Sequence, residues 1–241
     1  MKIMKSTCAE KIAALQHNRY FEGVEVEILR ELTDHMTLNQ YSRGEILFFE
    51  GDVCAGLFIL QSGSVKLYKL SPQGRELIIR VLQGTETFNE VPVFDGKENA
   101  VNVSVLEDSR IWNIDAQALR DTLHRYPHMA HSIILSLSKN LRMLVDLVEE
   151  MSFFQVTTRL ARLIIALSDE ELAGNRNDRV TQDEMAARLG TVREVVARSL
   201  RELERSGVIH TSRGKIEVLD PQMLIEWAHL VRVTYDMKRF G

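Results

Sequence analysis

Residues 180–209 read VTQDEMAARLGTVREVVARSLRELERSGVI and hold two short segments with the apolar spacing of helices. Thr181 is followed three residues later by Glu184, a pair that typically caps the start of a helix. Gly190 permits a tight turn after the first segment, because glycine adopts backbone conformations closed to most other residues. We therefore predict two crossing helices, the second of which buries one apolar stripe: Val195, Val196, Leu200 and Leu203.

The residues on both sides of this stretch extend the pattern. A helix is predicted for residues 158–174 upstream, and another from Pro221 to about Phe240 downstream. Two short apolar runs, VIHT at 208–211 and KIEVL at 215–219, flank a turn of polar and glycine residues. The order helix, turn, helix, β-hairpin predicts a winged helix-turn-helix.

Basic residues gather in the same stretch. The first 151 residues carry 16 Lys and Arg against 21 Asp and Glu, whereas residues 193–215 carry six against three. On the second helix Arg193, Glu194 and Arg198 lie away from the apolar stripe and near the helix start, where recognition helices meet base edges. We therefore predict that eight residues contact DNA: Thr181, Thr191, Arg193, Glu194, Arg198, Arg201, Arg213 and Lys215.

Glu194 and Arg198 also have an interpretation that involves no DNA. They are four residues apart in the orientation that forms an ion pair on any exposed helix, worth about 0.3 kcal/mol. The neighbouring turn and hairpin favour the DNA interpretation, since Arg213 and Lys215 at the hairpin tip are then suited to contact phosphates.

The first half of the chain has a different period. Residues 6–36 show helical spacing that ends at Met36, and predict short helices. From Tyr41 to Ile114, short β-rich runs alternate with turn residues, and Ser-Pro-Gln-Gly at 71–74 is a strong hairpin turn. This spacing predicts a compact antiparallel β-roll rather than a parallel sheet with crossover helices.

A regular heptad pattern follows the β-rich segment. From Ala130 to Met151 the apolar residues are spaced alternately four and three apart, which is the seam of a helix that packs on a similar helix. A helix lying on its own β-roll is the alternative. We predict a homodimer interface along this seam, formed by Ile134, Leu137, Leu141, Leu144, Val148 and Met151.

Together these segments predict an α+β protein in three parts: a sensor domain with N-terminal helices at 1–125, a dimerisation helix at 126–152 and a DNA-binding domain at 153–241. No apolar segment approaches the ~18 residues of a membrane span, and the N-terminus is unlike a signal peptide, so we expect a cytoplasmic protein without membrane contact. Cys8 and Cys54 are too few for an iron–sulfur cluster and too far apart for a Cys-x-x-Cys site, which predicts two reduced thiols.

Residues 20–220 resemble the family of the cyclic-AMP receptor protein and the fumarate and nitrate reduction regulator. The motifs that carry the resemblance are GEILFFEGD, GLFILQSGSVKLYK, FNEVPVF followed by AVNVSVLEDS, and GTVREVVARSL. The resemblance implies a β-roll sensor, a long dimer helix and two recognition helices in successive major grooves, with RNA polymerase as an expected partner. The Arg-Glu-x-x-x-Arg pattern of the receptor branch is matched by Arg193, Glu194 and Arg198.

The expected effector pocket departs from that branch. Family members that bind cyclic nucleotides carry Phe-Gly-Glu and, downstream, Arg-Ser/Thr-Ala, in which the Arg neutralises the phosphate. Here the first motif is Phe88-Asn89-Glu90 and the second is Glu98-Asn99-Ala100. Because a carboxylate at the Arg position repels an anion, we do not expect cyclic AMP to bind.

Two kinds of effector remain open at this point. His124, His128 and His131 lie near the start of the seam helix, where one of them could hold a non-covalent haem that responds to nitric oxide or carbon monoxide. The alternatives are a small metabolite as effector and ordinary solvated histidines.

The sequence therefore predicts a homodimeric regulator that binds double-stranded DNA at a palindrome of TGTGA type in response to a signal. An effector-binding signalling subunit that acts through protein partners is the alternative function. We do not expect an enzyme, since the sequence contains no nucleophile triad, phosphate loop or paired-metal motif.

Overall fold

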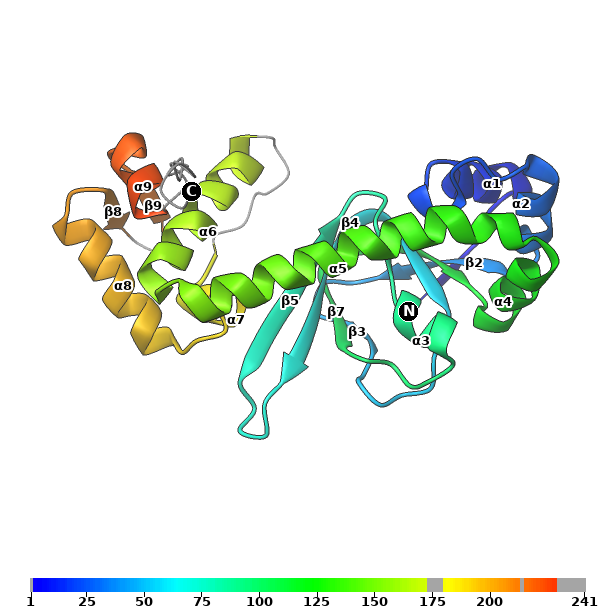
Figure 1. The fold of residues 1–241 in the computed structure, drawn as a ribbon, viewed down its shortest axis with the longest axis horizontal. Helices are drawn as coiled ribbons and strands as arrows, with labels where there is room; N and C mark the ends of the chain where they lie inside the picture. The colour runs from blue at the N-terminus through cyan, green and yellow to red at the C-terminus, as the bar shows by residue number, and fades with distance from the viewer. Residues whose placement is uncertain (1, 173–179, 213–214, 229–241) are drawn as a thin grey trace, which may run out of the picture. The chain divides into compact units, whose positions relative to one another are not determined.

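The computed structural model describes residues 2–172, 180–212 and 215–228, without the side chains of 169–172 (Figure 1). The chain forms two compact units, Met1–Val145 and Asp146–Gly241, which we call the sensor unit and the DNA unit. The boundary lies inside the long helix rather than at one of its ends. No helix in the described ranges is long and apolar enough to cross a bilayer.

The sensor unit is built on one antiparallel sheet, as expected for a β-roll. Its central strands β4 and β7 pair over most of their length, and β2 and β5 flank them in the order β1-β2-β7-β4-β5, with β3 on β7 and β6 on β4. The strands are β1 (Lys2–Met4), β2 (Met36–Tyr41), β3 (Ile46–Phe48), β4 (Leu57–Leu70), β5 (Glu76–Gln83), β6 (Thr87–Phe88) and β7 (Asn102–Ile114).

Two positions, one in a turn and one within a strand, show why glycine is needed in this sheet. Gly74 closes the β4–β5 hairpin at φ +78°, and its N–H donates to the Ser71 carbonyl at 2.8 Å, which confirms the predicted turn. Gly63 lies within β4 at φ +92°, where a Cβ would lie 2.3 Å from the Ser109 Oγ. A larger residue there would force the two central strands apart.

Short helices cover the ends of the roll. They are α1 (Cys8–Gln16), the 3₁₀ turn η1 (Arg19–Phe21), α2 (Val26–Thr33), α3 (Glu90–Asp95), α4 (Ala116–Arg125) and the 3₁₀ turn η2 (Pro127–Met129). The predicted helical segment 6–36 was wrong at its end, because Met36 begins β2 and pairs with Ile114. The sequence also missed β1, an edge strand of three residues that is too short to show a period.

The long helix α5 (Ala130–Phe153) begins in the sensor unit and ends in the DNA unit. The DNA unit continues with α6 (Val156–Leu172), α7 (Gln182–Leu189), α8 (Arg193–Arg205), the hairpin β8 (Ile209–Ser212) and β9 (Lys215–Val218), and α9 (Pro221–Trp227). The predicted closing helix reached Phe240, whereas α9 ends at Trp227, and residues 229–241 lie outside the described part of the chain. One apolar core joins α6, α7, α8, β8 and α9.

Candidate DNA interface and effector pocket

The turn between α7 and α8 sets where α8 begins. The Thr181 Oγ1 accepts a hydrogen bond from the Glu184 N–H at 3.1 Å, so Thr181 caps α7 as predicted. Gly190 ends α7 at φ +62°, and the next N–H, that of Thr191, donates to the Ala186 carbonyl at 2.9 Å. These bonds close the turn, and α8 begins at Arg193.

One face of α8 is buried and the other is exposed. Val196, Leu200 and Leu203 lie in the core of the DNA unit, while Val195 is only half-buried. Ser199, on the same face, accepts a hydrogen bond from the Thr157 hydroxyl at 3.0 Å. The opposite face exposes three of the predicted DNA residues, Glu194, Arg198 and Arg201, and a fourth, Arg193, is exposed as the first residue of α8.

These exposed residues have few partners inside the protein. Within the described residues, the side chains of Glu194 and Arg198 form no hydrogen bond or ion pair, so the i,i+4 ion pair considered above is not made. Arg193 lies 3.7 Å from the carboxylate of Asp183, and both side chains are mostly exposed. Arg201 donates to the Ala197 carbonyl at 3.1 Å. The Glu194 carboxylate and the Arg198 guanidinium are therefore available to another molecule.

The hairpin is tied to α8 by a single carboxylate. Glu204 accepts from the Thr211 N–H at 2.9 Å and from its hydroxyl at 3.1 Å, and lies 3.4 Å from the His210 Nδ1. These bonds lower the pKa of Glu204, the backbone bond most of all. Lys215 is exposed at the start of β9, and Arg213 lies outside the described residues.

A cavity of about 510 Å³ lies where α7, α8 and the hairpin meet. Its lining includes Thr181, Arg193 and Lys215, which come from three different elements. The fold therefore brings together three of the predicted DNA residues that are up to 34 positions apart in the chain.

In the sensor unit, the first half of the expected pocket motif is buried and bonded to the protein itself. Phe88 stacks on Phe58 with ring centroids 5.1 Å apart. Asn89 adopts a left-handed conformation at φ +68°, and its side chain donates to the Gly56 carbonyl at 3.0 Å. These two residues shape the strand end and the start of α3.

Glu90 faces a polar network made by residues that the sequence did not single out. Its Oε1 accepts from the Asn140 Nδ2 of α5 at 2.6 Å. The Asn140 Oδ1 in turn accepts from Arg19 at 3.2 Å and from Arg80 at 3.3 Å, and its Nδ2 lies 3.5 Å from the Tyr20 hydroxyl. No local pattern could reveal this network, because its bonds join residues 50 to 121 positions apart.

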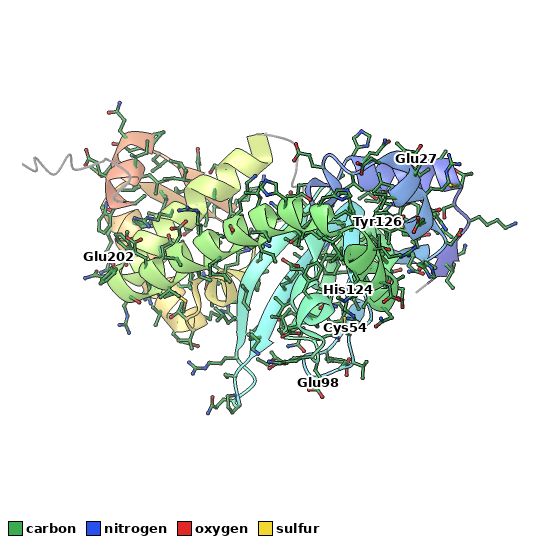
Figure 2. All side chains as sticks on the ribbon, turned by 45° about the vertical axis from the view of Figure 1, so that its right-hand side comes forward. Glu27, Cys54, Glu98, His124, Tyr126 and Glu202 are labelled. Carbon is green, nitrogen blue, oxygen red and sulfur yellow. The ribbon has the colours of Figure 1, made fainter. Side chains whose placement is uncertain are left out.

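The second half of the motif lies in other surroundings. Asn99 is buried. Its backbone carbonyl accepts a hydrogen bond from the Gly51 N–H, and its own N–H donates to the Asp52 carbonyl. Glu98 and Ala100 are exposed, and Glu98 lines a cavity of about 750 Å³ together with Cys54, Lys97 and Arg120. Figure 2 shows Glu98 and Cys54 close together at this side of the sensor unit. Glu90 is not in the lining of that cavity, so the two halves of the motif do not share one set of contacts.

The three histidines lie on successive elements, His124 in α4, His128 in η2 and His131 in α5, and all are exposed. The His128 Nε2 is 3.1 Å from the Glu25 carboxylate. A histidine that binds haem usually lies in a closed apolar pocket. The exposed positions of these three histidines therefore do not favour any of them as a haem ligand. The described residues contain no group of three or more His, Cys, Asp or Glu side chains placed to hold a metal ion.

The predicted seam on α5 is largely exposed in the single chain. Leu141 is 63% exposed and Val148 64%, and Ile134, Leu144 and Met151 are also exposed. Leu137 differs, because it packs partly against the core of the sensor unit. The helix-on-roll alternative thus describes one edge of α5. The rest of the seam is an exposed apolar stripe that no other described residue of the chain covers.

Comparison with known proteins identifies both halves of the chain. Residues 38–126 match the cyclic nucleotide-binding domain, and residues 158–227 match the Crp-like helix-turn-helix domain. The CRP-like cAMP-activated global transcriptional regulator of Mycobacterium tuberculosis is 26% identical, over 85% of this chain and 93% of that relative. The cyclic AMP receptor protein of Thermus thermophilus is also 26% identical, over 86% of this chain and 95% of that relative.

Solved structures share the fold. A regulator of the crp/fnr family from Eubacterium rectale superposes with a TM-score of 0.73 at 22% identity, over 88% of this chain and 100% of that one. The c-di-GMP responsive regulator CLP of Xanthomonas campestris gives 0.69 at 24% identity, over 81% and 99%. With its antiparallel sensor sheet, long helix and Crp-like helix-turn-helix, the chain belongs to the CRP/FNR family of DNA-binding transcription regulators.

Proposed function

We propose that the protein acts as a homodimer that binds a palindrome of two inverted TGTGA-type half-sites in response to a signal. The observation that carries this proposal is the exposed face of α8, on which Glu194 and Arg198 have no partner within the described residues. Because neither charge is engaged within the described part of the chain, both are available to the base edges that a recognition helix contacts.

Each exposed group matches one kind of DNA contact. The guanidiniums of Arg193 and Arg198 can donate two bonds to the O6 and N7 of guanine, and Glu194 can accept from the amine of cytosine. Lys215 and Arg201, placed at the hairpin and further along α8, are suited to phosphate oxygens. Half-sites of TGTGA type supply guanines, and cytosines on the opposite strand, for these groups.

The second subunit is argued from α5. A stripe of exposed leucine, isoleucine and valine side chains along a helix is costly in water, and a copy of the same helix presents the same 3.5-residue repeat. Two copies would place two α8 helices about one helical turn of DNA, roughly 34 Å, apart. RNA polymerase is the protein partner that we expect for the DNA-bound dimer.

The effector in this proposal is not cyclic AMP. Glu98 adds negative charge to the loop in which cyclic-nucleotide binders carry an Arg, and Glu90 is already bonded to Asn140. A small metabolite or a gas sensed through haem are the two alternatives. Protein grown with added haem separates them, since a Soret band that shifts with nitric oxide or carbon monoxide requires bound haem, and a colourless protein that switches on a metabolite excludes it.

Fluorescence anisotropy with labelled DNA tests the DNA-binding proposal. The expected result is tight binding to a TGTGAN6TCACA duplex and at least 100-fold weaker binding to a scrambled duplex of the same composition, since specific sites exceed random DNA by about 10³ or more. A duplex with one half-site inverted is the control for the dimer geometry. Equal affinity for all three duplexes would contradict the proposal and favour the signalling-subunit alternative.

A further inference from the structure

The polar network around Glu90 is linked by hydrogen bonds between groups of the protein itself. The Glu90 carboxylate is bound by Asn140, and the Asn140 amide oxygen is bound by both Arg19 and Arg80. Arg80 also forms an ion pair with Glu86. Two guanidiniums therefore balance two carboxylates within the protein, without a bound ion or molecule.

Tyr20 fills the centre of this network and is held from three sides. Its side chain is fully buried, and its N–H donates to the Asn18 Oδ1 at 3.0 Å. Asn18 donates to the Thr87 hydroxyl at 2.6 Å, next to the strand that leads to α3. The Ser132 hydroxyl of α5 donates to the Tyr20 carbonyl at 2.7 Å. The turn that carries Tyr20 is thus fastened to both the sheet and α5.

The charge state of Tyr20 suits this position. Burial raises the pKa of the Tyr20 phenol most, and the negative charge of Glu90 raises it further, although Arg19 and Arg80 act in the opposite direction. At neutral pH the hydroxyl therefore keeps its proton beside the Glu90 carboxylate.

Asn140 connects the network to the seam. Its side chain is directed at Glu90, and the next residue, Leu141, is among the most exposed of the predicted interface residues. Any movement of Glu90 that breaks the 2.6 Å bond changes the support of α5 in the middle of the stripe that would meet a second subunit.

We propose that Tyr20 and Asn140 take the place of a ligand beside Glu90, that they hold α5 in its DNA-binding arrangement without an added effector, and that Asn140 is the residue that transmits an opening of the network to the seam. This proposal rests on the DNA-binding function proposed above and defines the direction of its regulation: the protein without effector binds DNA, and a signal lowers the affinity by opening the network.

The test uses the full chain with no effector added. Asn140→Ala removes the connection, Tyr20→Phe removes only the buried hydroxyl, and Lys139→Ala truncates an exposed neighbour as the matched control. Amide hydrogen exchange of residues 133–145 and DNA affinity for the TGTGA palindrome are measured for each. We expect the wild type to bind without effector, Asn140→Ala and Tyr20→Phe to weaken binding by about fivefold or more, and Lys139→Ala to change it less than about twofold.

Exchange in α5 should rise about tenfold in the first two variants and stay unchanged in the control. The double variant separates coupling from a general loss of stability, since the two losses should not add if both break one network. Exchange and binding in Asn140→Ala that match Lys139→Ala, or tighter DNA binding by Asn140→Ala, would overturn the proposal. A wild type that does not bind the palindrome without effector would also overturn this proposal, whereas equal binding of the palindrome and the scrambled duplex would contradict the DNA-binding function. The exchange data decide separately whether the network supports α5.

Discussion

The two units treat their functional polar groups in opposite ways. In the sensor unit, Glu90 and Asn140 are bonded to each other and enclosed with Tyr20. In the DNA unit, Glu194 and Arg198 are exposed and have no partner among the described residues. Charges that are paired inside a protein fix its conformation, whereas unpaired charges on a helix face remain available for a polyanion. The comparison therefore separates polar groups that are bonded within the sensor unit from groups on α8 that are available to another molecule.

The largest effect is expected at the seam that lies between these two surfaces in the chain. Replacing Leu141 and Leu144 together by Glu would place unpaired charges in the proposed helix pair, so the protein should sediment as a monomer and lose DNA affinity by about 100-fold or more. The control variant Lys139→Glu/Arg142→Glu introduces two carboxylates at exposed polar positions beside the seam and should stay dimeric. A dimeric Leu141→Glu/Leu144→Glu protein would rule out the helix-pair interface.

The next largest effect is on DNA affinity, and it distinguishes base contacts from phosphate contacts on α8 and the hairpin. Arg198→Ala should cost about 1–3 kcal/mol on the palindrome and relax the preference at one base pair, whereas Lys215→Ala should weaken palindromic and random DNA about equally and lower the salt dependence. Competition binding at two salt concentrations measures both. Equal losses on both kinds of DNA for Arg198→Ala would show that it contacts the backbone.

A smaller effect is expected on the pH dependence of stability, which should differ between a group of the sensor unit and a group of the DNA unit. The pKa of Tyr20 is raised, so the stability that its neutral form gives is present below the unfolded value of about 10 and is lost as pH rises above it. The pKa of Glu204 is lowered, so its contribution is present above the unfolded value of about 4.5 and is lost as pH falls through the folded value.

Thermal unfolding from pH 3 to 11 should therefore show alkaline loss that Tyr20→Phe reduces and acid loss that Glu204→Gln reduces. Tyr126→Phe is the comparison variant, because the hydrogen bond to Glu31, more than burial, raises the pKa of Tyr126, and it should reduce the alkaline loss less than Tyr20→Phe does. The assignment fails if Tyr20→Phe leaves the alkaline limb unchanged or if Glu204→Gln acts at the alkaline end.

The smallest effect is expected for cyclic AMP, which should change neither stability nor DNA affinity. Cyclic AMP at millimolar concentration should shift the melting temperature by less than about 1 °C and leave DNA affinity unchanged, since a ligand that does not bind the folded state adds no stability. Glu98→Arg is the informative companion variant, because it removes the repulsive charge. A clear stabilisation of the unmodified protein by cyclic AMP would show that the closed network around Glu90 opens for a nucleotide.

The architecture was predictable from the sequence where local signals are strong. The heptad spacing from Ala130 to Met151 predicted α5, the Thr181 cap and Gly190 predicted the α7–α8 turn, and the alternation of β runs with turn residues predicted the antiparallel sheet. Short or unusual elements were missed. Three residues of β1 show no period, and Met36 follows helical spacing although it pairs as a strand.

The sequence by itself determined the family motifs and the exposed face of α8, because helix periodicity places Glu194 and Arg198 opposite the buried Val196 and Leu200 without reference to the rest of the fold. Arg193 is exposed because it is the first residue of the helix. Only the tertiary structure decided the surroundings of the pocket motif. It directed Glu90 to Asn140 and Glu98 to a different cavity, and it brought Arg19, Tyr20 and Arg80 to Asn140 across more than 50 residues. Hydrogen bonds of this kind depend on how sheet and helix pack in space, and no residue's neighbours in the chain carry that information.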